Sequence, residues 1–277
     1  MSTPVADKVH PAQEAVLQVA RDYADAWRTA DAPLMARAIH PEFTKRWLSR
    51  SPAGTYLEEA GASRMVRWTA DGGGKATHER DEVLFLHQHG SIAATKVMMS
   101  DRVEHLLLAE FDSQWKLFTV FSESRQWEER RDKSVAARHE AAINRVVMDY
   151  TEGYYTGNPA RARAAIHPDL CKKNVMRDPS GHDLVEYFTG SKFVATIARR
   201  GATGKAEDPW PEARATILDR YGDAALVKLE TRWFDYQEVV LIDGEWKIIN
   251  VLWTGKSGEP QAVEEWFYLR DSSEPEL

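Results

Sequence analysis

Two His-Pro pairs are the first residues that suggest chemistry. His40-Pro41 and His167-Pro168 each stand between a short apolar helical pattern and a run typical of a strand. Histidine titrates near neutral pH, so His40 or His167 could act as a general acid or base if that strand lines a cavity. The alternative is a structural histidine that hydrogen-bonds the backbone at the turn, and its occurrence at both places favours a scaffold role.

Asp101 is a second candidate acid. It follows small and apolar residues at alternate positions of an expected strand, and Trp233 takes its place in a matching segment later in the chain. A carboxylate on an apolar strand face is expected to have a raised pKa, as a general acid requires. The alternative is that the strand ends before Asp101-Arg102, which has the composition of a turn.

His87 and His89 lie on the same side of another expected strand. This spacing can chelate a metal if a carboxylate or a third histidine, such as His78 or His105, joins them. The alternative is an exposed hairpin end beside Gly90. We assign no metal and no cofactor to the chain.

Composition narrows the function classes. The 277 residues are 43% hydrophobic and 29% charged, as in soluble globular proteins. The net charge of −7, without clustered Lys and Arg, makes nucleic acid an unexpected partner. The single Cys171 leaves no paired cysteines for a disulfide or a zinc site. The N-terminus lacks the apolar core of a signal peptide, so we expect a cytoplasmic protein without a membrane partner.

The chain contains an internal repeat, which decides the fold. Three segments recur at an offset of 127 residues, and further matches follow after a short insertion. The matching segments are Asp22-Tyr23 with Asp149-Tyr150, Ala38-Ile39-His40-Pro41 with Ala165-Ile166-His167-Pro168, Lys45 with Lys172, and Trp115-Lys116 with Trp246-Lys247. We therefore expect two domains, residues 1–127 and 128–277, joined at a charged run.

Each half predicts three helices followed by antiparallel strands. In the first half we expect helices at 12–30, 33–39 and 56–70 and strands at 81–89, 92–101, 104–111 and 115–122. In the second half we expect helices at 139–156, 160–166 and 182–200. The short helix of each half ends at His-Pro, because proline disfavours helical geometry in the residue before it. The result is an α+β fold in which a curved sheet wraps the helices and leaves a cavity at its open end.

This pattern resembles the nuclear transport factor 2-like superfamily, whose cone-shaped fold is shared by ketosteroid isomerase, scytalone dehydratase and SnoaL-like polyketide cyclases. The strings Asp149-Tyr150, residues 165–170 and residues 242–251 (IDGEWKIINV) resemble the branch labelled "putative lumazine-binding". The resemblance covers both halves. It implies two tandem cones paired through the outer faces of their sheets, which makes the chain a pseudo-dimer that could also form a homodimer.

Ketosteroid isomerase uses a carboxylate base and two acidic hydrogen-bond donors, which gives a test of the site. By position, its tyrosine matches Tyr23 and Tyr150, its protonated acid matches Leu107 and Glu238, and its base matches Trp47 and Asn174. Tryptophan and asparagine cannot abstract a proton. The resemblance therefore leaves only Tyr150 and Glu238, as a donor pair that could polarise a carbonyl group.

We expect a small-molecule-binding protein with an apolar, aromatic-lined pocket in one or both repeats. The expected lining residues are Tyr23, Trp47, Tyr154, Met176, Trp233 and Trp253, and the catalytic candidates are Tyr150, Glu238, His167, Asp101 and His40. One alternative is a cofactor-free isomerase, cyclase or dehydratase that acts on a polyketide-like or steroid-like carbonyl compound. The other is an interaction module whose cones are plugged by large residues such as Trp47 and Trp233.

Overall fold

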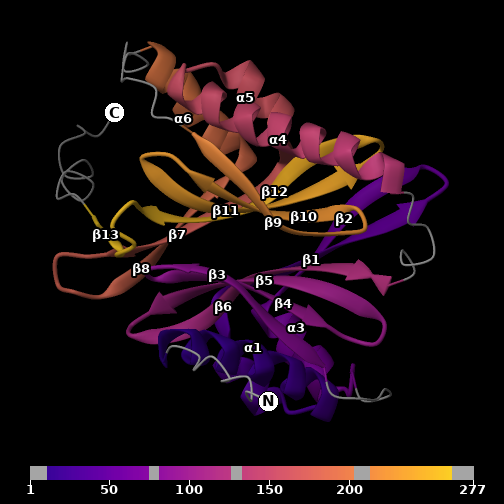
Figure 1. The fold of residues 1–277 in the computed structure, drawn as a ribbon. Helices are drawn as coiled ribbons and strands as arrows, with labels where there is room; N and C mark the ends of the chain where they lie inside the picture. Colours follow the sequence, from indigo (N-terminus) through magenta and orange to yellow (C-terminus); the bar gives the residue numbers. More distant parts are fainter. Residues whose placement is uncertain (1–10, 75–80, 126–132, 203–212, 264–277) are drawn as a thin grey trace, which may run out of the picture.

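The two repeats form two α+β units that stack sheet against sheet (Figure 1). The computed structural model describes residues 11–74, 81–125, 133–202 and 213–263. The expected boundary at 127/128 lies outside these residues. In the first repeat the elements are α1 (Pro11–Thr29), α2 (Ala32–Ala38), β1 (Ile39–Ser51), β2 (Gly54–Gly61), α3 (Ala62–Ala70), β3 (Glu82–His89), β4 (Ile92–Met98), β5 (Arg102–Phe111) and β6 (Gln114–Ser124).

The second repeat follows the same order of elements. They are α4 (Lys133–Tyr155), α5 (Pro159–Ala165), β7 (Ile166–Arg177), β8 (Asp183–Thr189), α6 (Gly190–Ala202), β9 (Arg214–Tyr221), β10 (Ala224–Glu230), β11 (Trp233–Ile242), β12 (Glu245–Gly255) and β13 (Gln261–Ala262). The first sheet has the order β2-β1-β6-β5-β4-β3, and the second has β13-β7-β12-β11-β10-β9 with β8 paired to β7. The two sheets confirm the tandem α+β fold.

The short helices end within one residue of the predicted positions. Helix α2 begins at the N-cap Asp31, whose side chain accepts a hydrogen bond from the Leu34 N–H, and Asn158 caps α5 in the same way. Each helix ends at the alanine directly before an Ile-His-Pro segment, because the proline favours extended geometry at the histidine.

The third helix of each half is shorter than predicted. Residues 54–61 and 183–189 form strands that pair antiparallel with β1 and β7, so that α3 and α6 begin only at Ala62 and Gly190. Residues 184–188 alternate their faces and are rich in β-branched and aromatic residues, which favours a strand. The helical interpretation of these segments was therefore wrong.

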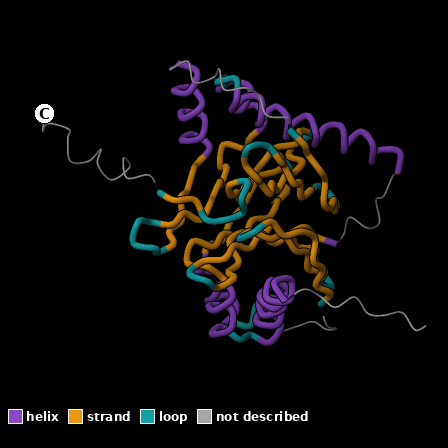
Figure 2. Tube along the Cα trace, turned by 60° about the vertical axis from the view of Figure 1, so that its left-hand side comes forward, coloured by secondary structure: helices purple, strands orange, loops and turns teal. Residues whose placement is uncertain are grey.

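Helices cover one face of each sheet, and the opposite faces, which are the outer faces of the two cones, meet at the centre of the molecule (Figure 2). The contact between the sheets is apolar, and its buried residues are Ile92, Ala94, Leu107, Ala109 and Phe118 from the first repeat and Val175, Leu226, Phe234, Tyr236 and Leu252 from the second. At one edge the turn at Gly90 lies directly on Gly258, and the Ser91 N–H donates to the Gly258 carbonyl at 2.7 Å.

None of the described helices is long and apolar enough to cross a membrane.

Candidate functional site

A tyrosine, a lysine and a carboxylate occupy the same three places in both repeats. In the first they are Tyr23 on α1, Lys45 on β1 and Glu104 on β5; in the second they are Tyr150 on α4, Lys172 on β7 and Asp235 on β11. All six side chains point from their helix or strand into the space between helices and sheet. The helical stripe and the strand alternation place them there, because each lies on the apolar face of its element.

In the first repeat these three groups bind one another. The Tyr23 hydroxyl donates to Glu104 at 2.9 Å, and the Lys45 Nζ lies 2.5 Å from the Glu104 carboxylate and 3.0 Å from the Tyr23 hydroxyl. Burial alone would raise the pKa of Glu104, but the charges of Lys45 and Arg102 lower it below its ordinary value. Burial lowers the pKa of Lys45. We call this arrangement the closed set.

In the second repeat the same groups stand further apart. The Tyr150 hydroxyl lies 3.3 Å from the Asp235 carboxylate, and the Lys172 Nζ lies 3.6 Å from it, beyond hydrogen-bond distance. Aspartate is one methylene shorter than glutamate, so the carboxylate stays back toward β11 and does not reach the lysine as Glu104 does. We call this arrangement the open set.

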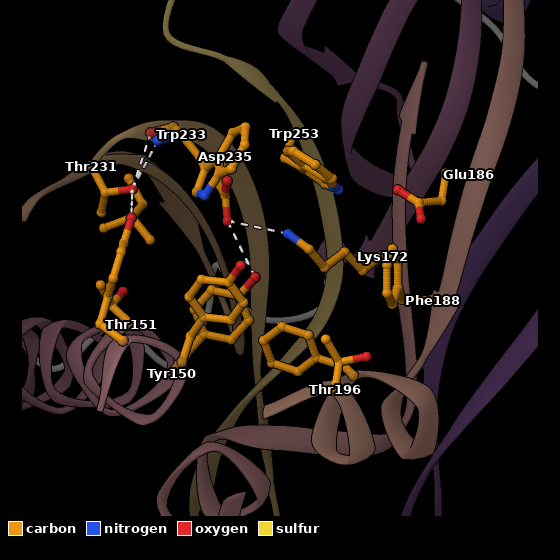
Figure 3. A pocket seen from close by; sticks show the side chains of 14 residues that line it. Tyr150, Thr151, Lys172, Glu186, Phe188, Thr196, Thr231, Trp233, Asp235 and Trp253 are labelled. Carbon is orange, nitrogen blue, oxygen red and sulfur yellow. Dashed lines mark hydrogen bonds and ion pairs between the residues drawn. The ribbon is translucent and has the colours of Figure 1, made fainter. Parts of the chain in front are cut away.

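The open set lines a cavity of about 130 Å³, roughly ten times the 10–15 Å³ that one water needs. Figure 3 shows the lining side chains around this space. The walls are mainly aromatic, and the ring-bearing residues are Tyr150, Tyr154, Tyr155, Phe188, Phe193, Trp233 and Trp253. The Lys172 Nζ lies 4.7 Å from the centroid of the Trp253 ring, within cation–π distance.

The open set offers hydrogen-bond donors to a ligand. Burial raises the pKa of Tyr150 well above its ordinary value, so its hydroxyl keeps its proton. Burial lowers the pKa of Lys172, and the nearby Asp235 carboxylate opposes that shift. The amine is a donor in either protonation state, so Tyr150 and Lys172 can both donate to one acceptor atom.

Glu186 is a lining residue that sequence reasoning missed. It lies on β8, faces the cavity, and forms no hydrogen bond or ion pair with any residue that the structure describes. Burial raises the pKa of Glu186, and the charges of Lys192 and Lys172 oppose the shift. The signal that could have found it is the strand alternation of residues 184–188, which was assigned to a helix.

Glu238 does not join Tyr150. It lies three residues beyond Asp235 on β11 and therefore on the opposite face, between the two sheets, where Asn250 donates to it at 2.5 Å. Burial raises the pKa of Glu238 to about 8. The Tyr150–Glu238 donor pair was a wrong prediction, because the two side chains point to different faces of the sheet.

Asp101 is also not a shifted acid. Strand β4 ends at Met98, and Asp101 lies in the turn, where the Arg102 guanidinium binds its carboxylate at 2.5 Å. This hydrogen bond lowers the pKa of Asp101, contrary to the expected rise. The residue that matches Trp233 at the start of the equivalent strand is Arg102.

The first repeat has a cavity of its own, of about 400 Å³ and more polar. Its lining residues include Trp27, Trp47, Trp68, Lys45, Arg50, Asp101, Arg102 and Glu123. Arg102 is paired with Asp101, and Arg50 is paired with Asp223 of the second repeat at 2.7 Å. Its cations therefore already have carboxylate partners.

The two His-Pro histidines are placed in the fold away from both cavities. The Nδ1 atoms of His40 and His167 accept hydrogen bonds from the backbone N–H groups of Glu42 and Asp169. Burial lowers the pKa of His40 to about 4 and also lowers that of His167. Neither lines either of these two cavities, so the arrangement supports the structural interpretation.

Most of the expected ligand-binding residues do line cavities. Tyr154, Trp233 and Trp253 line the second, and Trp47 lines the first. Trp47 and Trp233 stand at the walls and do not fill the cones. Tyr23 is held in the closed set, and Met176 lies beside β13 without lining the cavity.

His87 and His89 face the other repeat. The Nδ1 of His87 lies 2.7 Å from the Tyr236 hydroxyl, and the His89 ring stacks on Phe234 at 4.0 Å between centroids. The Nε2 of His105 lies 2.7 Å from the carboxylate of Asp219, so this histidine also contacts the second repeat. In the described residues no group of three or more His, Cys, Asp or Glu could hold a metal ion.

Comparison with known families agrees with the repeat and the fold. The family model described as "Putative lumazine-binding" matches residues 11–121 and again residues 138–254. The chain belongs to this family. It carries two tandem copies of the family's domain, one in each α+β unit.

Three similar solved structures each match less than half of this chain. An NTF2-like protein of unknown function from Shewanella baltica is 19% identical, with 43% of this chain and 94% of that chain covered and a TM-score of 0.33. A similar protein from Silicibacter pomeroyi is 19% identical over 43% and 98%, with a TM-score of 0.34. A protein titled putative scytalone dehydratase from Novosphingobium aromaticivorans is 14% identical over 45% and 88%, with a TM-score of 0.28. A search of curated proteins finds no match.

Proposed function

We propose that the protein binds a small planar carbonyl compound in the cavity of the second repeat. Support comes from the open set, in which Tyr150 and Lys172 stand as two donors beside an aromatic wall. Aromatic faces stack on planar rings, and two convergent donors select for an acceptor such as a carbonyl oxygen.

The difference between the repeats is the observation that carries this proposal. The same three positions hold a closed set in the first repeat and an open set in the second. In the closed set each polar group already has a partner, so a ligand would have to break a buried ion pair. The open set can improve its hydrogen bonding by taking a ligand, because its own contacts are long.

The family description suggests a first probe. Lumazine is a planar fused heterocycle with two carbonyl oxygens, so it has the ring and the acceptor that this cavity fits. Carbonyl compounds of the polyketide or steroid type remain a second class with the same two features. In either case we propose that the compound stacks on Trp253 and accepts from Lys172 and Tyr150.

Titration with lumazine, followed by tryptophan fluorescence, tests this proposal. Wild type is expected to show saturable quenching. Tyr150→Phe removes one donor and should weaken binding by about 3-fold to 10-fold, which corresponds to one ordinary hydrogen bond. Tyr23→Phe is the matched control and should leave the affinity unchanged. Equal loss in both variants, or no saturable quenching with lumazine or with an aromatic ketone, would contradict the proposal.

A further inference from the structure

The Lys172 amine reaches into the second cavity with only a long contact to a carboxylate. Its Nζ lies 3.6 Å from Asp235, beyond hydrogen-bond distance, and 4.7 Å from the centroid of the Trp253 ring. In Figure 3 the side chain extends from the β7 wall, with Asp235 on one side of it and Glu186 on the other. A molecule that enters the cavity therefore meets the nitrogen atom directly.

Lys45 of the first repeat is an internal reference for this amine. It holds the matching place on β1 and also lines a cavity. Its Nζ donates to the Glu104 carboxylate at 2.5 Å and to the Tyr23 hydroxyl at 3.0 Å. Such an amine cannot turn its lone pair toward a carbon atom without breaking a buried ion pair, which is costly. The two repeats thus present the same residue once with its amine engaged and once with its amine available.

We infer that the second cavity binds an aromatic aldehyde covalently, through an imine between the carbonyl carbon and the Lys172 Nζ. This inference rests on the binding function proposed above and names aldehydes as the ligand class. The aromatic walls take the ring, and the amine reaches the carbon that the ring carries. Lumazine has only amide-type carbonyls, which do not condense with amines, so it serves as a non-covalent probe of the same cavity.

The condensation balances with the groups in the cavity. The lone pair of the neutral Lys172 amine attacks the carbonyl carbon, and the carbonyl π pair moves onto oxygen. The Asp235 carboxylate carries one amine proton to this oxygen, which gives a carbinolamine. The second amine proton follows the same route, the hydroxyl group leaves as water, and the nitrogen lone pair forms the carbon–nitrogen double bond. No oxidant or reductant is consumed.

The surroundings of Lys172 favour the neutral amine that this reaction needs. Burial lowers the pKa of Lys172, because an ammonium group is poorly solvated among aromatic rings, and the carboxylates of Asp235 and Glu186 oppose this shift. The titratable groups that line the cavity around the amine are Tyr150, Tyr154 and Tyr155 from α4, Glu186 from β8 and Asp235 from β11. Desolvation in an apolar pocket is one way in which proteins activate a lysine as a nucleophile.

Reductive trapping with benzaldehyde tests the inference. The full-length protein is incubated with benzaldehyde and sodium cyanoborohydride near neutral pH, and peptide mass spectrometry locates the benzylated lysines. Lys172 should be labelled at least about tenfold faster than Lys45, because Lys45 must first leave its buried ion pair. Lys45 is the matched control within the same molecule. Labelling of Lys172 that is no faster than that of Lys45 would overturn the inference.

Exchanging the two carboxylates tests whether the gap at Lys172 sets its reactivity. Asp235→Glu brings the carboxylate toward Lys172, as Glu104 reaches Lys45, and should slow labelling of Lys172 to about the rate of Lys45. Glu104→Asp is the reciprocal variant and should speed up labelling of Lys45. Rates of both lysines that stay unchanged in the two folded variants would contradict the inference.

Fluorescence titration with lumazine separates this inference from the proposed function, because lumazine cannot form the imine. Saturable binding of lumazine without preferential labelling of Lys172 refutes the imine and leaves the binding function standing. Absence of both refutes both.

Discussion

The Lys172 ammonium lies 3.6 Å from the Asp235 carboxylate, whereas the matching Lys45 and Glu104 of the first repeat are in contact at 2.5 Å. The main chemical difference within the two sets is one methylene group, since aspartate replaces glutamate. We attribute the ligand binding proposed for the second repeat to this gap.

Asp235→Glu should therefore close the second set. The longer side chain can bring its carboxylate onto Lys172 and fill part of the cavity, so binding of lumazine should weaken by about tenfold or more, equal to about 1.4 kcal/mol. Fluorescence titration measures this. An unchanged affinity in the folded variant would show that the gap is not what admits the ligand.

Glu104→Gln should destabilise the first repeat. It leaves the Lys45 ammonium buried without its counter-charge, which costs about 3–5 kcal/mol in comparable pairs. Urea unfolding at neutral pH measures the loss, and Asp235→Asn, at the looser pair, should cost less.

The contribution of Glu104 to stability should depend on pH. Because the pKa of Glu104 is lowered in the folded state, the stabilisation by its carboxylate is present above the ordinary pKa of 4.5 and fades as the pH falls below that value. The difference between variant and wild type should shrink accordingly in acid.

Much of this organisation follows from the sequence, and the errors have physical causes. The repeated Tyr and Lys positions and the His-Pro helix ends are local patterns and could be matched directly. The carboxylates were missed because Glu104 and Asp235 differ in residue type between the repeats, and counting back from the last hairpin pointed instead to Leu107 and Glu238, three residues further along the strand. A shift by an odd number of residues along a strand moves the side chain to the opposite face. The predicted acid was therefore placed at the contact between the sheets and not in the cavity.

Glu238 makes stability depend on pH. Burial between the sheets raises its pKa from 4.5 to about 8, because the charged form is costly there. The stability of the neutral form is fully present below pH 4.5 and is lost as the pH rises through about 8. Glu238→Gln should match wild type near pH 4.5 and exceed it above pH 8 by on the order of 3–5 kcal/mol. A constant difference across this range in urea unfolding would argue against a buried, neutral Glu238.

Gly90→Ala should loosen the contact between the repeats. Gly90 has a φ of +52°, and a Cβ there would lie 2.2 Å from the Gly258 carbonyl oxygen. Gly244→Ala is the matched control, with a φ of +86° and nothing within 4 Å of its Cβ. The backbone conformation should cost both variants about 1–3 kcal/mol, and Gly90→Ala should lose more stability because it also meets a backbone atom. Equal melting temperatures would contradict a tight contact at this edge.

A crystal structure of the chain with bound lumazine would test the central claim most directly. We predict one molecule per chain in the second repeat, stacked on Trp253, with a carbonyl oxygen within hydrogen-bond distance of the Lys172 Nζ and the Tyr150 hydroxyl. Lumazine seated in the first repeat, or in the second without contact to either donor, would contradict the account.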